Sequence, residues 1–128
     1  MTTDVRMRRE EDRMKLPQFR RAVVPKRKLV AYLLSEDHPD GSGKARWLRQ
    51  YGFTPQNWRA LAVALKRHAK EQSVASMQDS AFGTRYTLVG RLESPDGRNP
   101  SVRSVWFVET GGTIPRLVTA YPARRGRT

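Results

Sequence analysis

Acid–base chemistry at neutral pH has few candidates in this chain, which contains two histidines and no cysteine. Histidine is the side chain whose ordinary pKa lies nearest neutrality, so His38 and His68 are the leading candidates. His38 lies in a Gly-, Pro- and Asp-rich stretch that predicts a loop, where functional residues concentrate. His68 comes near the end of an expected helix, which indicates a helix C-terminal partner or a partly buried surface residue. His38 is therefore a candidate functional residue; closing its loop by hydrogen bonds is the alternative.

A second set of residues could contact a phosphate. Lys44 follows Gly41-Ser42-Gly43 at the start of an expected helix, whose N-terminus could hold one phosphate; the glycines could equally serve only a tight turn. Thr119 and Tyr121 stand two residues apart in the last expected strand, so alternation places them on one face with Leu117. They could share a phosphate, or serve only β-propensity and edge packing.

Positive charge dominates the chain, whose formal net charge is +13. Residues 1–28 and 116–128 carry most of the excess, and such basic ends attract phosphate backbones without reading sequence. The composition therefore favours a nucleic-acid partner, with solubility or an acidic protein partner as the alternatives. Further candidate nucleic-acid contacts are Arg116, Arg85, Arg91, Arg103, Arg124 and Arg125. Those on the strands could equally form an ordinary solvated face.

Several function classes lack their signatures. The sequence contains no Walker loop, no dinucleotide fingerprint, no paired-histidine zinc helix and no recognised metal-ligand spacing, so we expect no metal and no other cofactor. No apolar run approaches the roughly 20 residues that span a bilayer, and no secretory h-region is visible. Together with the absence of cysteine, this predicts a cytoplasmic protein that does not use a membrane.

The periodicity predicts one α+β domain over residues 16–122, with a basic flexible arm at 1–15 and a basic tail at 123–128. About three N-terminal helices precede a four-stranded antiparallel meander, with the helices on one sheet face. The chain enters through an extended lead-in at 16–24. The expected helices are 25–34, 44–51 and one that starts at 54, and the expected strands are 74–77, 84–92, 101–109 and 116–121.

An ordered set of short motifs resembles an uncharacterised bacterial domain family over residues 16–122. These motifs are Leu16-Pro17, Ala22-Val23-Val24-Pro25, Lys28-Leu29, Tyr32-Leu33-Leu34, His38-Pro39, Gly43-Lys44-Ala45, Gly52-Phe53, Gly83-Thr84, Gly90, Pro95-Asp96-Gly97-Arg98, Val105-Trp106 and Pro115-Arg116-Leu117-Val118-Thr119-Ala120-Tyr121-Pro122. The family is similar to toxin modules of polymorphic-toxin and toxin–antitoxin systems, and its layout resembles the barnase/EndoU/RelE-type metal-independent ribonucleases.

The resemblance implies RNA cleavage by attack of a 2′-hydroxyl on the adjacent phosphorus. In that reaction His38 would be the acid or base, Lys44 would stabilise the phosphate, Thr119 and Tyr121 would donate hydrogen bonds, and Arg116 would be a clamp. A small acidic antitoxin or immunity protein would silence the enzyme. The alternatives are a non-catalytic nucleic-acid-binding accessory protein, and an antitoxin or assembly subunit that binds an acidic protein.

Overall fold

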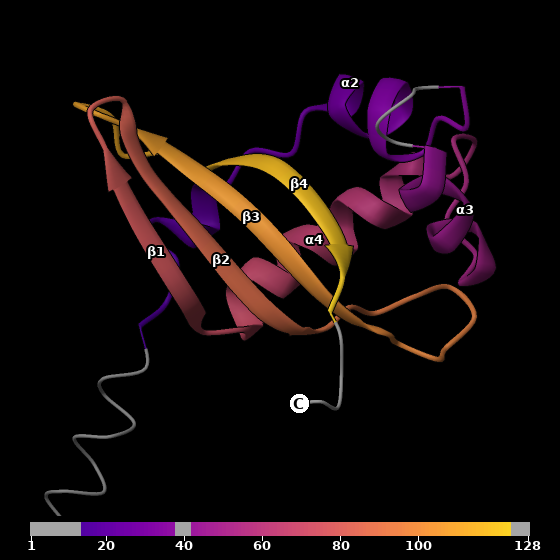
Figure 1. Ribbon diagram of the computed structural model, residues 1–128. Coiled ribbons are helices and arrows are strands. Elements are labelled where there is room, and N and C mark those ends of the chain that lie inside the picture. The colour runs from indigo at the N-terminus through magenta and orange to yellow at the C-terminus, as the bar shows by residue number, and fades with distance from the viewer. Residues whose placement is uncertain (1–13, 38–41, 124–128) are drawn as a thin grey trace, which may run out of the picture.

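The computed structural model describes residues 14–37 and 42–123. Four antiparallel strands form one sheet in the order β1-β2-β3-β4 (Figure 1), as the short connections predict. The strands are β1 Val74–Ser80, β2 Gly83–Arg91, β3 Ser101–Glu109 and β4 Arg116–Pro122. The expected α+β meander is therefore present, and the bounds of its last three strands lie within one residue of those expected.

The helices precede the strands in the described part of the chain. They are η1 Phe19–Arg21, α2 Lys26–Lys28, η2 Leu29–Leu33, α3 Ser42–Gln50 and α4 Trp58–Glu71. Of these, α2 and η2 follow each other directly and together account for the helix expected over 25–34. None of the described helices is long and apolar enough to cross a lipid bilayer.

Helix α4 lies across one face of the sheet, and the main core forms between them (Figure 1). Leu61, Leu65 and Ala69 of α4 are fully buried, as the helical spacing predicts, and meet Leu88 and Trp106 of the sheet in one apolar cluster. The other helices differ from the expectation that all pack on one face. Helices α2, η2 and α3 gather beside β4, at the edge of the sheet. This position brings their side chains within reach of the face that α4 leaves uncovered.

The segment before α2 passes behind the sheet from one edge to the other (Figure 1). The Val74 backbone N–H donates to the Met14 carbonyl at 2.7 Å beside β1, and the Leu117 N–H donates to the Val23 carbonyl at 3.0 Å beside β4. The 3-10 turn η1 interrupts the extended lead-in that the prolines predict. Leu16 is buried under the sheet, so this segment completes the core.

A β-bulge in β4 decides which of its side chains reach the core. Val105 of β3 pairs with Thr119, whereas the next residue, Trp106, pairs with Leu117, so Val118 is an extra residue in the ladder. Leu117 and Ala120 are consequently both buried in the core. Thr119 lies on the opposite face, and the expectation that it shares a face with Leu117 is wrong because strict alternation does not continue through a bulge.

Helix α4 starts at Trp58, four residues after the expected start at Thr54. A local turn replaces that first helical turn: the Asn57 side-chain oxygen accepts from the Thr54 backbone N–H at 2.7 Å and from its hydroxyl at 3.0 Å. The Asn57 side-chain amide also donates to the Gly52 carbonyl at 2.9 Å. These bonds satisfy the polar groups of the turn locally, and they therefore favour the turn over an earlier start of the helix.

Gly52 ends α3 in the left-handed region, with a φ of 99°. Its Cα also lies against the loop between β2 and β3, since a Cβ built there would be 2.9 Å from the Pro95 Cβ.

We expect Gly52→Ala to lower the free energy of unfolding by at least about 1 to 2 kcal/mol, from backbone strain alone. Urea unfolding checks this value. Gly43→Ala is the control, since its new Cβ meets nothing within 4 Å, and an equal loss in both variants would contradict the explanation.

Candidate active site on the open sheet face

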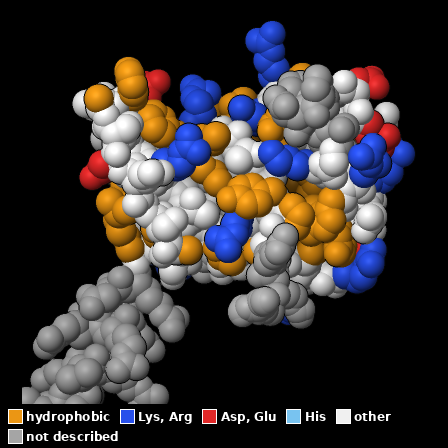
Figure 2. All heavy atoms as spheres, in the orientation of Figure 1, with side chains coloured by type: hydrophobic (Ala, Val, Ile, Leu, Met, Phe, Trp, Pro, Cys, Tyr) orange, Lys and Arg blue, Asp and Glu red, His pale blue; other side chains and the backbone are white. Residues whose placement is uncertain are grey.

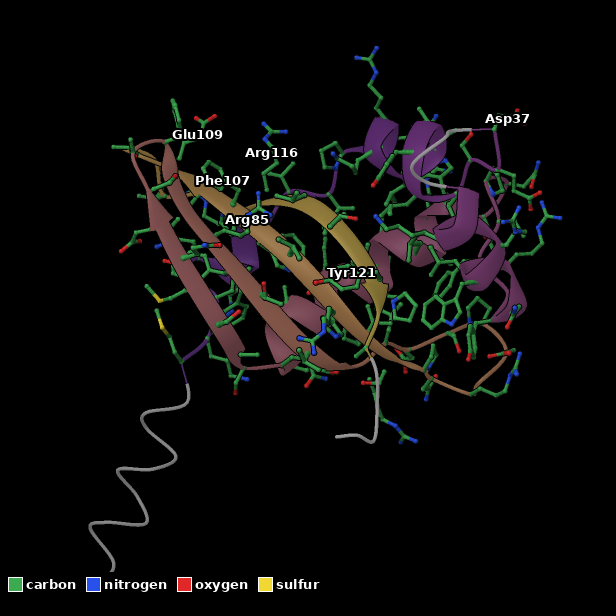
Figure 3. All side chains as sticks on the ribbon, viewed as in Figure 1. Asp37, Arg85, Phe107, Glu109, Arg116 and Tyr121 are labelled. Carbon is green, nitrogen blue, oxygen red and sulfur yellow. The ribbon has the colours of Figure 1, made fainter. Side chains whose placement is uncertain are left out.

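The face of the sheet turned away from α4 is called here the open sheet face. Strand pairing places on it Arg85, Thr87, Val89, Arg91, Arg103, Val105, Phe107, Arg116, Thr119 and Tyr121. Figure 2 shows basic side chains gathered there around a hydrophobic centre. The one carboxylate that the register adds to this face is Glu109, at the hairpin end of β3 (Figure 3). Over the described residues, the open sheet face therefore carries a net positive charge.

Lys44 of α3 reaches over the edge of β4 and joins three elements. Its Nζ donates to the Tyr32 hydroxyl at 2.8 Å and to the Thr119 Oγ1 at 3.3 Å. The two partners lie 12 and 75 residues from Lys44 in the sequence. A cationic donor and two hydroxyl groups thus meet at the border of the open sheet face.

Tyr32 belongs to this candidate site, although it was not among the candidate site residues drawn from the sequence. It lies in the wide turn η2, where the Leu34 N–H donates to the Leu29 carbonyl at 2.7 Å, five residues back. Leu29 and Leu33 are buried, while Tyr32 is half-buried with its hydroxyl at Lys44. Such π-type turns are rare and often occur at functional sites. The motif Tyr32-Leu33-Leu34 was the one sequence signal that could have indicated it.

A basic groove of about 770 Å³ opens between α2, η2 and the start of β4. Its apolar floor includes Phe107, and its walls carry Arg27, Lys28, Arg85 and Arg116. Arg85, Phe107 and Arg116 occupy one row across three strands, close together at one end of the face (Figure 3). The Lys28 Nζ lies 5.4 Å, and the Lys44 Nζ 5.0 Å, from the centre of the Tyr32 ring. Tyr32 lines the groove and also accepts from Lys44, so the groove borders the group formed by Lys44, Tyr32 and Thr119, called here the Lys44 cluster.

The structure brings together some of the predicted site residues. Lys44 and Thr119 are in contact, and Tyr121 lies on the same sheet face, opposite Arg103. Arg91 is on this face at the far end of β2. His38, Arg124 and Arg125 lie outside the described residues, so their predicted roles rest on the sequence.

His68 is buried in the core, which corrects the expectation of a helix-end or surface residue. The Gly90 carbonyl lies 3.0 Å from Nε2 and can only accept, so Nε2 carries the proton. Nδ1 then accepts from the Ser104 hydroxyl at 2.9 Å, and the Ser104 oxygen accepts from the Trp106 Nε1–H at 2.9 Å. Burial lowers the pKa of His68 below its ordinary value. This histidine is thus a neutral structural group rather than a catalytic one.

The buried neutral His68 predicts a loss of stability on acidification. Its pKa is lower in the folded than in the unfolded state, so below about pH 6.5 the unfolded chain binds the extra proton. We expect the free energy of unfolding to fall as the pH drops from 7 to 5, as measured by urea unfolding. His68→Gln should flatten this dependence and His38→Ala should preserve it. A dependence unchanged by His68→Gln would contradict the assignment.

The cluster is suited to binding an anion and stabilising added negative charge. An ammonium group donates to phosphate oxygens as a point charge, and hydroxyl groups add directed hydrogen bonds. Within residues 14–37 and 42–123, no three carboxylate or imidazole side chains come together as a metal-binding group. The chemistry that these residues themselves offer is phosphate binding with hydrogen-bond donors.

Comparison with known proteins identifies a family and a fold. The profile of a family described as "Domain of unknown function (DUF6883)" matches residues 15–124. The fold resembles that of a chain in a solved structure, "Contact-dependent growth inhibition toxin - immunity protein complex from Klebsiella pneumoniae 342". The TM-score is 0.64 at 16% identity, and the match covers 83% of this chain and 97% of the other. No curated protein is significantly similar in sequence.

Proposed function

Because this chain belongs to the DUF6883 family, and shares its fold with a component of a toxin–immunity complex, we propose that it is a metal-independent ribonuclease of a toxin system. The observation that carries the proposal is the contact of the Lys44 Nζ with Tyr32 and Thr119 at the edge of a basic sheet face. The positive charge of that face favours the view that this chain is the RNA-cleaving component of such a system, rather than the component that silences it. An acidic immunity protein would complement the same surface.

The proposed reaction joins the 2′-oxygen of a ribose to the adjacent phosphorus and breaks the bond from phosphorus to the 5′-oxygen. A general base removes the 2′-hydroxyl proton, and a general acid protonates the departing 5′-oxygen. The products carry a 2′,3′-cyclic phosphate and a 5′-hydroxyl. His38 is the proposed acid or base, on sequence grounds, since it stands six residues before Lys44 in the chain.

The other residues stabilise the charge that develops on phosphorus. Lys44 donates to a non-bridging phosphate oxygen, and Thr119 and Tyr121 add hydrogen bonds from the same face. Arg116 and Arg85 bind the neighbouring phosphates along the basic groove. These placements agree with the register of β4, where the bulge turns Thr119 out of the core.

Incubation of the purified protein with cellular RNA in excess EDTA tests the proposal. We expect cleavage products with 2′,3′-cyclic phosphate ends, and growth arrest when the protein is expressed. The double variant Lys44→Met/Thr119→Val should lose both, and it should still fold because both sites are half-buried at the surface. RNA binding without cleavage by the wild type would overturn the proposal in favour of a nucleic-acid-binding accessory protein.

A further inference from the structure

A second pocket lies at the opposite end of β4 from the basic groove. It encloses about 430 Å³ between α3, the loop that joins β2 to β3, and the end of β4 at Pro122. Pockets of this size hold small organic groups. Its lining carries two aromatic rings, from Trp47 and Tyr51, and two guanidinium groups, from Arg91 and Arg98. None of its described lining residues is acidic.

The aromatic wall resembles a stacking platform. The rings of Trp47 and Tyr51 are tilted by 59° with their centres 5.0 Å apart, and the Arg98 guanidinium lies 4.6 Å from the Tyr51 centre. Aromatic rings and guanidinium planes are the groups on which proteins stack unpaired bases. Asn99 and Ser101 in the same pocket offer an amide and a hydroxyl to the edge of a base.

The walls of this pocket are held in place before any ligand binds. The Asp96 carboxylate accepts from the Arg98 Nε at 2.6 Å and from the Ser94 hydroxyl at 2.8 Å. Arg98 also donates to the Gln50 carbonyl at 2.5 Å, which ties the loop to the end of α3. The motif Pro95-Asp96-Gly97-Arg98, unexplained by the proposed active site, thus builds one wall of the pocket. Such preorganisation lowers the entropic cost of binding.

The pocket lies next to the Lys44 cluster along α3 and β4. Trp47 follows Lys44 by three residues on α3, so both project from the same side of the helix, about 4.5 Å apart along its axis. On β4, Thr119 contacts Lys44, and Pro122, three residues further along the strand by about 10 Å, lines the pocket. A phosphate at Lys44 would therefore place an adjacent base beside Trp47.

We infer that the Trp47–Tyr51 pocket binds an unpaired base next to the phosphate held by Lys44, so that the substrate is single-stranded RNA. The inference rests on the proposed function for the identity of that phosphate. A base inside a duplex is stacked between its neighbours and cannot offer a face to the aromatic wall. Single-stranded loops and ends are consequently the targets, and double-stranded RNA is excluded from the pocket.

Binding of a fluorescent single-stranded 2′-O-methyl RNA tests the pocket apart from cleavage, because this RNA lacks the attacking hydroxyl. Stacking of one base is worth about 1 to 3 kcal/mol, so Trp47→Leu should weaken binding about 5- to 150-fold. Trp58→Leu is the matched control, since Trp58 is also half-buried against the core but lies outside the pocket. Thermal unfolding of both variants verifies that they are folded.

An abasic scan of the same RNA locates the base that the pocket holds. Removing the base at one position should weaken binding to the wild type and have little further effect on Trp47→Leu, because both changes delete the same contact. Equal affinities of Trp47→Leu and Trp58→Leu, or equal binding of a duplex, would overturn the inference. If the wild type binds in this base-dependent way but never cleaves unmodified RNA, the pocket stands and the ribonuclease proposal fails. If the wild type cleaves unmodified RNA but no abasic position weakens binding, the ribonuclease proposal stands and the pocket inference fails.

Discussion

Replacing Lys44 with Met should lower the single-turnover rate constant of RNA cleavage about a hundred- to a thousandfold, equivalent to about 3 to 4 kcal/mol of transition-state stabilisation. The Lys44 Nζ is held by Tyr32 and Thr119 before substrate arrives, so its charge needs no reorganisation when negative charge grows on phosphorus. Methionine retains most of the apolar stem and the helix propensity of lysine, and the fold should persist.

A second lysine separates this local effect from the loss of one positive charge. Lys66 is exposed on α4, on the far side of the sheet from the Lys44 cluster, so Lys66→Met removes the same charge at a distance. We expect Lys66→Met to change cleavage only slightly, through weaker long-range attraction that salt screens. Similar losses in the two variants at 0.15 M salt would refute the assignment of Lys44 to the reacting phosphate.

Replacing His38 with Ala should lower the same rate constant about a hundred- to ten-thousandfold, the range that a general acid or base contributes. The pH–rate profile is the more specific measurement, because loss of a titrating catalyst removes one limb of the profile. A merely structural histidine would lower the rate at every pH without changing the shape. The buried His68 is engaged with Ser104 and Gly90, which makes His38 the histidine to test.

Asp37→Asn is the control for His38→Ala, because it alters the neighbouring residue without removing an imidazole. Asp37 is exposed, and its backbone N–H donates to the Ser35 hydroxyl at 3.3 Å, a bond that asparagine retains. We expect this variant to keep both limbs of the profile. An unchanged profile in His38→Ala would assign the proton transfer to another group and leave the Lys44 prediction standing.

Elements defined by local pattern were predictable from the sequence. Strand β3 has the expected bounds, 101–109, because alternation and flanking turn residues act over neighbouring positions. The left-handed stop at Gly52 is equally local, since only glycine adopts that backbone conformation without cost. Lys44 and Thr119 were also candidate site residues from the sequence, and the structure places them in contact, while their catalytic roles stay predictions.

The tertiary structure alone decided which side chains share a surface. Thr119 faces Lys44 because a bulge at Val118 shifts the pairing of β4 with β3, and pairing register is a property of two strands rather than one. Tyr32 became a site residue, and His68 a core residue, through partners 12 and 36 positions away in the sequence. Periodicity reports only that a side chain faces an interior; the distant residue that it meets there depends on how the elements pack.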